Sequence, residues 1–261
     1  MSTTQSTFHP HLRVEIDGGV AVVTLDSPQT RNSQTPSMWV ALERVAEAVE
    51  QAGTRVVLLR AEGPSFSAGL DRGMLTPGGI EGEPDLVAAC APSPSSGIDE
   101  IRACQRGFAS LRAVPAVVVA AIQGHAVGAG AELALSSDIR VVADDVALSW
   151  PEVPLGLVAD LGGIARLAHV VGEARAMEIM LTGRAVGAVE AIRVGLANRA
   201  VPRAELDATA RETVRAILNL PEAAVREMTA LVRGVMVRGE DEQQQLEAAA
   251  QARLLHGLSR R

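Results

Sequence analysis

Apolar residues gather along the chain in short runs that alternate with longer amphipathic segments. Runs rich in Val, Leu and Ile at 20–26, 55–63 and 116–124 predict buried β-strands. Shorter runs at 138–145 and 147–150 predict further strands. Because helical segments separate the main strands, we predict an α/β fold of repeated strand–helix units.

Turn and capping residues set the expected limits of the first elements. The first strand is predicted to end at Ser27-Pro28. Thr35 is followed by Pro36, a residue favoured at the first position of a helix. We therefore expect Thr35 to be the N-cap of a helix that continues to about Gln51.

Two regions depart from this alternation. Residues 76–97 are rich in Pro, Gly and Ser, which predicts a surface insertion with only a short helical turn near Leu86. From about Glu205 onward the pattern is almost purely helical and divides into three segments. We expect this C-terminal region to pack on the main domain or on a neighbouring chain.

Composition narrows the class of protein. The chain has 261 residues, 48% hydrophobic and 21% charged, which indicates one large globular domain, alone or with a small appendage. The net charge of −7 disfavours nucleic acid or an anionic membrane surface as the main partner. The most apolar segment, 113–135, contains polar residues and predicts a core strand and helix instead of a membrane span.

Cysteine content and the first residues suggest a compartment. Cys90 and Cys104 are the two cysteines, and their spacing suits neither a metal site nor a disulfide framework. The first twelve residues lack the basic and apolar stretches of a signal peptide. We therefore expect a cytoplasmic protein.

The loop at 63–73 is the first candidate for chemistry. Ser67, Ala68 and Gly69 are small enough for another molecule to approach the backbone closely. A turn of this kind can present a free N–H group, which here would be that of Leu70. A plain tight turn would use the same residues.

The stretch 124–138 is the second candidate. Gly128, Ala129 and Gly130 lie at a predicted strand-to-helix junction, where the first N–H groups of a helix are unpaired and attract negative charge. Such groups can stabilise an oxyanion. Close packing of the helix on a sheet also requires small residues, and a dinucleotide-binding fingerprint would need glycine in place of Leu133.

Glu132 is the unusual residue of this helix. Its helical neighbours are small, apolar or hydroxyl-bearing, and none is basic. Burial without a partner would be costly and would raise its pKa. A functional carboxylate explains this arrangement, as would a distant Arg or a hydrogen bond to backbone.

The loop at 148–163 is the third candidate. Glu152 lies between Pro151 and Pro154 in an apolar setting, and Asp160 follows eight residues later. Asp160 could instead cap the following helix. Glu132 and Glu152 together suggest an acid/base pair whose surroundings tune their proton affinities.

Other residues carry weaker signals. The five histidines are scattered and do not form metal spacing, so no metal site is expected; His125 is interpreted as a core or rim residue. A GxSxG motif is absent, which argues against a serine nucleophile.

Taken in order, these stretches resemble the enoyl-CoA hydratase/isomerase (crotonase) family. The matching pieces are "FSAGLD", "AAIQGHAVGAGAELALSSDIRVVADD", "PEVPLGLVADLGG", "LTGRAVGAVEAIRVGLANRAVP" and the helical tail. They run from about residue 12 to the end, so the resemblance covers nearly the whole chain.

This resemblance implies a particular architecture and ligand. The fold would be a spiral of repeated ββα units, with residues 1–200 as the core and 201–261 as a helical trimerisation region. The assembly would be a homotrimer or a hexamer made of two trimers. The ligand would be an acyl-CoA thioester, with no cofactor beyond the coenzyme A of the substrate. The insertion 76–97 would border the acyl pocket.

The resemblance also implies site residues. The N–H groups of Leu70 and Ala129 would form an oxyanion hole for the thioester carbonyl. Further contacts to coenzyme A are expected from Ala68, Gly69, Leu70, Asp71 and Gly128, and from Arg31 near its phosphates.

The family resemblance maps the two hydratase glutamates onto Glu132 and Glu152. They would hold a water that adds across the 2,3 double bond of a 2-enoyl-CoA, as in degradation of fatty acids or related acyl groups; which one is base and which is acid stays open. Asp160 instead resembles the dienoyl-CoA isomerase branch, although that branch carries aspartate where this chain has Glu132. A proton shuttle by Glu152 and Asp160, and a non-catalytic acyl-CoA binder, are therefore the alternatives.

Overall fold

Strands and helices alternate along the chain, as the apolar pattern predicts. A computed structural model describes residues 4–93 and 95–259. The strands are β1 (Thr4–His9), β2 (Leu12–Asp17), β3 (Val20–Leu25), β4 (Ser33–Gln34), β5 (Val56–Ala61), β6 (Gly69–Leu70), β7 (Val117–Ile122), β8 (His125–Val127), β9 (Ile139–Ala143), β10 (Ala147–Ser149), β11 (Val186–Gly187) and β12 (Arg199–Val201).

The helices lie between and after these strands. They are α1 (Pro36–Gln51), α2 (Leu86–Cys90), α3 (Ile98–Ala113), α4 (Ala129–Leu135), α5 (Gly163–Val171), α6 (Glu173–Thr182), α7 (Ala188–Arg193), α8 (Leu206–Leu218), α9 (Glu222–Gly234) and α10 (Glu240–Leu258). Each of the predicted strands and helices is present, and Leu86 begins the short helix expected in the insertion.

A seven-stranded sheet forms the centre of the molecule. Its order is β1-β2-β3-β5-β7-β9-β12, with antiparallel pairs at the β1 edge and parallel pairs from β3 to β12. Along β5, Val57 and Leu59 contribute to one apolar cluster, and Val56 and Leu58 to another on the opposite face. Both faces of the sheet are therefore buried, which explains why its central strands are continuously apolar.

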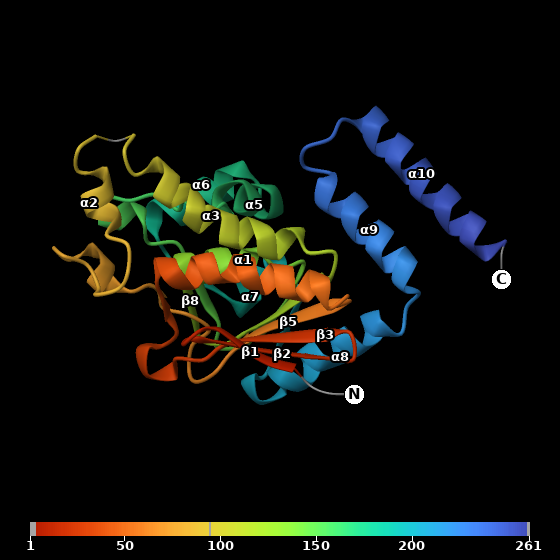
Figure 1. The fold of residues 1–261 in the computed structure, drawn as a ribbon, viewed down its shortest axis with the longest axis horizontal. Helices are drawn as coiled ribbons and strands as arrows, with labels where there is room; N and C mark the ends of the chain where they lie inside the picture. The colour runs from red at the N-terminus through yellow and green to blue at the C-terminus, as the bar shows by residue number, and fades with distance from the viewer. Residues whose placement is uncertain (1–3, 94, 260–261) are drawn as a thin grey trace.

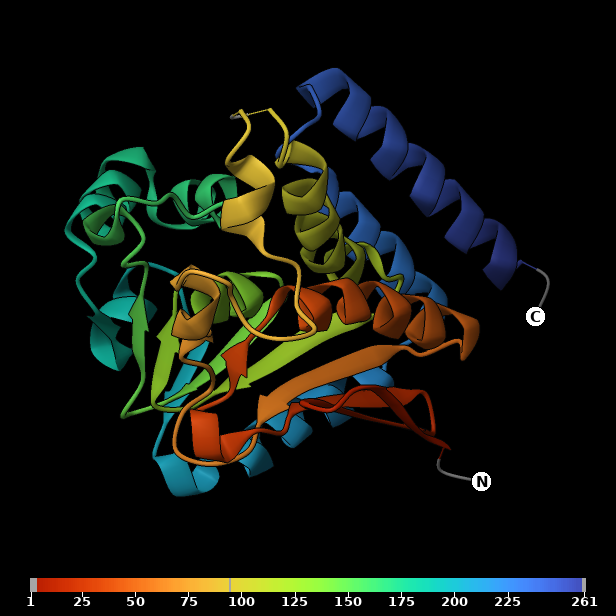
Figure 2. The same ribbon diagram turned by 60° about the vertical axis from the view of Figure 1, so that its left-hand side comes forward.

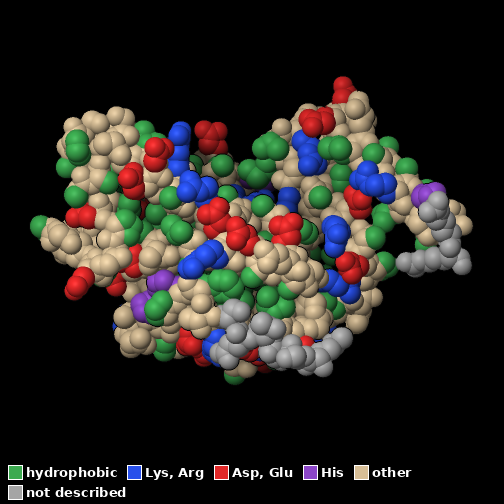
Figure 3. Space-filling view, viewed as in Figure 1, with side chains coloured by type: hydrophobic (Ala, Val, Ile, Leu, Met, Phe, Trp, Pro, Cys, Tyr) green, Lys and Arg blue, Asp and Glu red, His purple; other side chains and the backbone are tan. Residues whose placement is uncertain are grey.

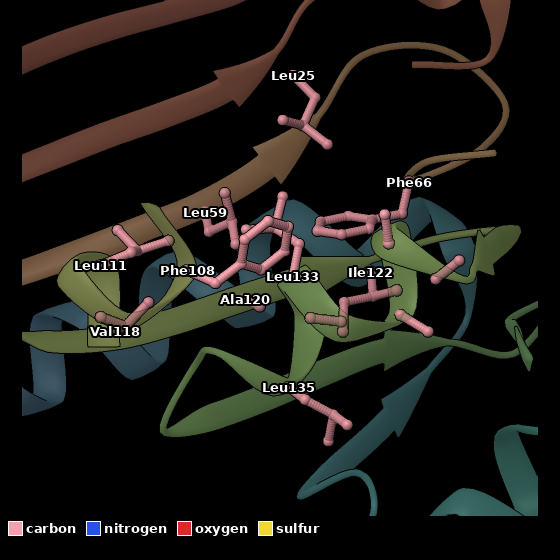
Figure 4. Packing of buried hydrophobic residues seen from close by; sticks show 14 of the residues in the cluster. Leu25, Leu59, Phe66, Phe108, Leu111, Val118, Ala120, Ile122, Leu133 and Leu135 are labelled. Carbon is pink, nitrogen blue, oxygen red and sulfur yellow. The ribbon is translucent and has the colours of Figure 1, made fainter. Parts of the chain in front are cut away.

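Helices cover the two faces of this sheet. Helices α1 and α3 lie on one face and α8 on the other (Figures 1 and 2). Figure 4 shows the packing on the first face, where Phe66 and Phe108 lie among Leu59, Ile122 and Leu133. This core fixes the sheet, and with it the loops that leave its strands.

A second, smaller sheet continues each unit of the first. Strands β8, β10 and β11 form it, and β4 pairs with β6 beside it. Three long parallel strands are followed by a short strand and then by an α-helix, in β3-β4-α1, β7-β8-α4 and β9-β10-α5. The predicted crotonase-like spiral of ββα units is confirmed.

Thr35 is the N-cap residue of α1, as predicted, and an acid from the insertion adds to this helix start. The Thr35 side chain itself accepts no N–H bond from the helix. The carboxylate of Glu83 accepts the N–H of Ser37 at 2.8 Å and its hydroxyl at 2.5 Å. Through these hydrogen bonds, an acid from the insertion 76–97 caps α1. Its negative charge at the helix N-terminus stabilises the helix further.

The C-terminal helices divide between the core and a projecting hairpin. Leu206, Ala210 and Val214 of α8 are buried against the large sheet. Helices α9 and α10 extend away from it (Figures 1 and 2). The predicted division at residue 200 falls inside β12, and α8 shares the core of the preceding domain.

One arginine ties α9 to the large sheet. The guanidinium of Arg233 donates to the carboxylate of Asp138 and to the carbonyls of Val114 and Ala116.

Within the part of the chain that the structure describes, the helices are too short or too polar to cross a bilayer.

The contact between α1 and α3 generates a stability prediction. A methyl group on Gly107 of α3 would collide with the carbonyl of Trp39 in α1. We expect Gly107→Ala to lower the free energy of unfolding by about 1–3 kcal/mol, measured by urea denaturation. In the matched control Gly257→Ala, where nothing lies near the added methyl, stability stays within about 1 kcal/mol of the parent. Equal stability of the two variants would contradict this packing.

Candidate active site

Parallel strands bring the three candidate loops to one edge. Strand β4 pairs with β6, the segment before β6 bridges to β8 through Ser67 and Ala126, and β8 pairs with β10, all in parallel. The carboxyl ends of parallel strands lie at the same edge of a sheet. The loops that begin after Leu70, Val127 and Ser149 therefore meet there.

These loops surround an open pocket. Both predicted oxyanion donors and all three candidate acids line it. Ala68, Gly69 and Gly128 line it as well. Sequence reasoning did not single out the other wall residues, chiefly Trp39, Arg72, Leu75, Leu155, Leu157 and Val158.

Gly128 makes room for Glu152 at the start of α4. Its φ of +51° lies in the region that favours glycine. A methyl group there would lie 2.5 Å from Oε1 of Glu152. Ala129 is the next residue and the first of α4, so its N–H has no carbonyl partner inside the helix.

The second predicted donor, Leu70, lies across from Ala129. The N–H of Asp71 donates to the carbonyl of Gln34 in β4 at 2.8 Å. Successive N–H groups of a strand point to opposite sides, so the N–H of Leu70 points away from β4. On that side a methyl group on Gly69 would overlap the carbonyl of Val127 and lie 3.5 Å from the nitrogen of Ala129. The two candidate N–H groups therefore belong to backbones in direct contact.

Glu132 lies on the first turn of α4 and is 1% exposed. Its Oε2 accepts the N–H of Leu161 at 2.6 Å, and its Oε1 accepts that of Gly163 at 3.2 Å. Burial raises its pKa to about 8, although these N–H groups lower it; the carboxylates of Glu152 and Asp160 raise it further. Glu132 thus bonds to backbone and lines the pocket at the same time.

Glu152 enters the pocket from the turn after β10. Its main-chain carbonyl accepts the N–H groups of Leu155 and Leu157, both at 2.9 Å, which fixes the turn. Oε2 is buried and has no hydrogen-bond partner among residues 4–93 and 95–259. Burial raises the pKa of this carboxyl, and the carboxylate of Asp160 adds to the effect.

Asp160 lies at the same pocket but is more exposed than the two glutamates. Its carbonyl accepts a hydrogen bond from the Gln105 side chain at 2.7 Å, and burial raises the pKa of its carboxyl. Gly162 occupies the N-cap position of α5 and no side chain caps it there. The helix-cap alternative for Asp160 is therefore wrong, since Glu132 accepts the N–H of Gly163 at that end.

Two predicted coenzyme contacts lie outside the pocket wall. Arg31 is exposed, and its carbonyl accepts the N–H of Ala68 at 2.8 Å, which places it beside the Ala68 loop. The carboxylate of Asp71 accepts from the Ser33 hydroxyl and the Gly73 N–H, both at 2.9 Å. Asp71 thus shapes its own loop, and contact of either residue with coenzyme A stays a prediction.

Arg72 and the insertion complete the comparison. Arg72 lines the pocket and directly follows the "FSAGLD" motif. Its position next to this motif is the sequence signal that could have identified it as a basic residue of the site. The described residues of 76–97 do not line this pocket, whereas Leu75 does. Within the described ranges, His, Cys, Asp and Glu side chains form no cluster that could hold a metal ion.

Comparison with known proteins gives a consistent family. The family model described as "Enoyl-CoA hydratase/isomerase" matches residues 15–261. "Probable enoyl-CoA hydratase echA8" of Mycobacterium bovis is 31% identical over 82% of this chain and 77% of its own length. "Carnitinyl-CoA dehydratase" of Escherichia coli K12 is 33% identical over 85% of this chain and 80% of its own.

Solved structures agree in fold and over nearly the full length. A Thermobifida fusca protein in complex with CoA has a TM-score of 0.88 and 39% identity, covering 96% of this chain and 95% of that one. A Thermobifida fusca structure with acetoacetyl-CoA has a TM-score of 0.87 and 40% identity, covering 94% and 95%. The family model, the relatives and the solved structures all indicate the same family. The chain belongs to the enoyl-CoA hydratase/isomerase (crotonase) family.

Proposed function

We propose that this member of the family is a hydratase that adds water across the 2,3 double bond of a 2-enoyl-CoA. The family supports a hydratase- or isomerase-type enzyme acting on acyl-CoA thioesters. The observation that carries the finer proposal is that one pocket is lined by the buried Glu132, the half-buried Glu152 and the two residues whose N–H groups are the candidate oxyanion donors. No cofactor beyond the coenzyme A of the substrate enters the proposal.

The N–H groups of Leu70 and Ala129 would bind the thioester oxygen. Polarising that carbonyl makes the β-carbon electrophilic and stabilises the enolate that forms when water adds. Ala68, Gly69 and Gly128 would lie along the same part of the ligand, because their small side chains leave the backbone accessible. Arg72 at the pocket wall and Arg31 beside the Ala68 loop would then face the coenzyme's phosphates.

Glu132 and Glu152 would share the proton transfers. One carboxylate takes a proton from water as its oxygen bonds to the β-carbon, and one carboxylic acid gives a proton to the α-carbon. The raised pKa values of both side chains favour a pair that carries one proton between them. Oε2 of Glu152 has no hydrogen-bond partner among the described residues, so this carboxylate has an acceptor that no other group there uses.

One observation favours a second candidate, a dienoyl-CoA isomerase. Both oxygens of Glu132 already accept backbone N–H bonds, whereas Oε2 of Glu152 has no hydrogen-bond partner in the described part of the chain, and Asp160 lines the same pocket. Glu152 and Asp160 could then move a proton along a conjugated acyl chain without adding water.

We also propose a homotrimer, or a hexamer of two trimers, held through the C-terminal helices. Exposed apolar side chains on α9, α10 and the turn between them have no core to cover them, and hydrophobic side chains are visible on this part of the surface in Figure 3. They are Met228, Val232, Val235, Met236, Val237, Leu255 and Leu258. Such a patch is typical of a protein–protein interface.

Three single variants separate hydratase from isomerase. If the chain is a hydratase, Glu132→Gln and Glu152→Gln should each lower kcat for crotonyl-CoA by about a hundredfold or more, because each removes a proton carrier. Asp160→Asn should change it less than about tenfold. Loss of the conjugated thioester absorbance measures the rate.

The opposite pattern would support the isomerase. Asp160→Asn and Glu152→Gln would then abolish turnover of a 3,5-dienoyl-CoA, with Glu132→Gln less affected. If the parent turns over neither type of thioester but binds both, and Glu132→Gln binds as tightly, the chain is a non-catalytic acyl-CoA binder. The hydratase proposal does not survive either result.

The pKa of Glu132 predicts a pH profile. The protonated form of this raised-pKa acid is present below about pH 8 and is lost as the pH rises through that value. Because hydration needs one protonated member of the pair, we expect kcat/KM to fall about tenfold per unit above that pH. Initial rates in a buffer series measure it, with circular dichroism to confirm folding at each pH. A rate that stays level far above that pH would contradict the assignment.

Assembly is measured directly by light scattering after size-exclusion chromatography. We expect the mass of a trimer or hexamer at micromolar concentration. Val232→Glu on α9 should lower the mass because it places a charge in the apolar interface. The matched change Val87→Glu, at an equally exposed position on α2, should leave the mass unchanged. A monomeric parent would overturn the proposed assembly.

A further inference from the structure

A buried chain of hydrogen bonds connects the pocket wall to the loop of Leu70. Trp39 of α1 lines the pocket, and its indole N–H donates to Oε1 of Gln34 at 2.7 Å. Nε2 of Gln34 donates to the hydroxyl oxygen of Ser67 at 2.9 Å. That oxygen also accepts the N–H of Gly69 at 3.1 Å. The four residues thus form one continuous path into the backbone that precedes Leu70.

The path has a fixed direction, and the Ser67 hydroxyl within it has its donor and both acceptor positions in use. An indole can only donate, so the oxygen of the Gln34 amide must face Trp39 and its nitrogen must face Ser67. The Ser67 hydroxyl donates to the carbonyl of Asn32 at 2.7 Å, which uses its single proton while both lone pairs are occupied. Gln34 and Ser67 are fully buried, so bulk water does not compete for the hydrogen bond between them.

The backbone at the end of this path is unusual. Gly69 has a φ of +81°, and its Cα lies against the carbonyl of Val127, so it is held between β8 and the Ser67 hydroxyl. The next N–H, that of Leu70, is the proposed oxyanion donor. A shift of Gly69 by a fraction of an ångström would therefore change the distance from this N–H to the thioester oxygen.

We propose that Gln34 is a positioning residue for the oxyanion loop, and that it links the indole of Trp39 to the amide of Gly69 through Ser67. Contact between the ligand and Trp39 is thereby coupled to the placement of the Leu70 N–H. The proposal rests on the function proposed above. It adds that the identity of residue 34 decides how strongly the carbonyl is polarised.

The direct readout is the carbonyl stretch of a bound thioester. Butyryl-CoA labelled with ¹³C at the carbonyl is saturated, so it cannot be hydrated, and its C=O band moves to lower wavenumber when N–H groups bind the oxygen. We expect this shift in the parent and in Glu132→Gln, and a much smaller shift in Gln34→Leu. The control Met38→Leu, a buried neighbour outside the path, should keep the parent shift.

Kinetics separate positioning from general loss of structure. Gln34→Leu should lower kcat for crotonyl-CoA about tenfold or more, with KM changed less than about threefold, because the donor acts mainly on the transition state. Gln34→Glu retains the acceptor for Trp39 but loses the N–H that donates to Ser67, so it should not recover kcat. Trp39→Phe breaks the first bond alone, and adding it to Gln34→Leu should cost nothing further.

Each result counts for or against the path. A folded Gln34→Leu protein with the parent band shift and kcat would overturn it, as would additive effects in the double variant. If Gln34→Leu does not fold, Trp39→Phe decides in the same way. If the parent shifts the band but hydrates no enoyl-CoA, the hydratase proposal fails and the path is still tested. If the parent does not shift the band, the oxyanion site and this proposal fail together.

Discussion

The site depends on the absence of side-chain atoms around one buried carboxylate. Glu132 has room beside the start of α5 because residue 163 is a glycine. A methyl group on Gly163 would lie 2.5 Å from its Oε1, and one on Gly130 would lie 2.7 Å from the carbonyl of Ser67. These close approaches hold α4 against α5 and against the Ser67 loop. The small residues around Glu132 therefore allow its carboxylate and the candidate oxyanion N–H groups to lie in the same pocket.

Electrostatics follow from the same packing. The three acids of the pocket influence one another: Glu152 and Asp160 both raise the pKa of Glu132, and Asp160 raises that of Glu152. Burial is the larger cause in each case, and only backbone N–H groups oppose it at Glu132. A pocket that holds several acids with high proton affinity beside fixed N–H groups is suited to moving protons next to a polarised carbonyl.

Much of the fold could be predicted because it follows from local patterns of apolar and polar residues. Continuous apolar runs gave the buried parallel strands, and helical periodicity gave α1 and the C-terminal helices. The conflict between Glu132 and its apolar neighbours pointed to the site, and local sequence also indicated Glu152 and the N–H of Leu70. The family resemblance then assigned the N–H groups of Leu70 and Ala129 to an oxyanion hole and the two glutamates to hydration. The features that were missed depend on long-range contacts. Glu83 caps a helix 46 positions earlier in the chain, and Trp39 and Arg72 become pocket residues only once the loops are in place.

A crystal structure with acetoacetyl-CoA bound would test this arrangement of the site. We expect the thioester oxygen within hydrogen-bond distance of the N–H groups of Leu70 and Ala129, with the carboxylates of Glu132 and Glu152 both facing the carbons next to that carbonyl. A thioester oxygen away from both N–H groups, or either glutamate turned away from the acyl carbons, would contradict it.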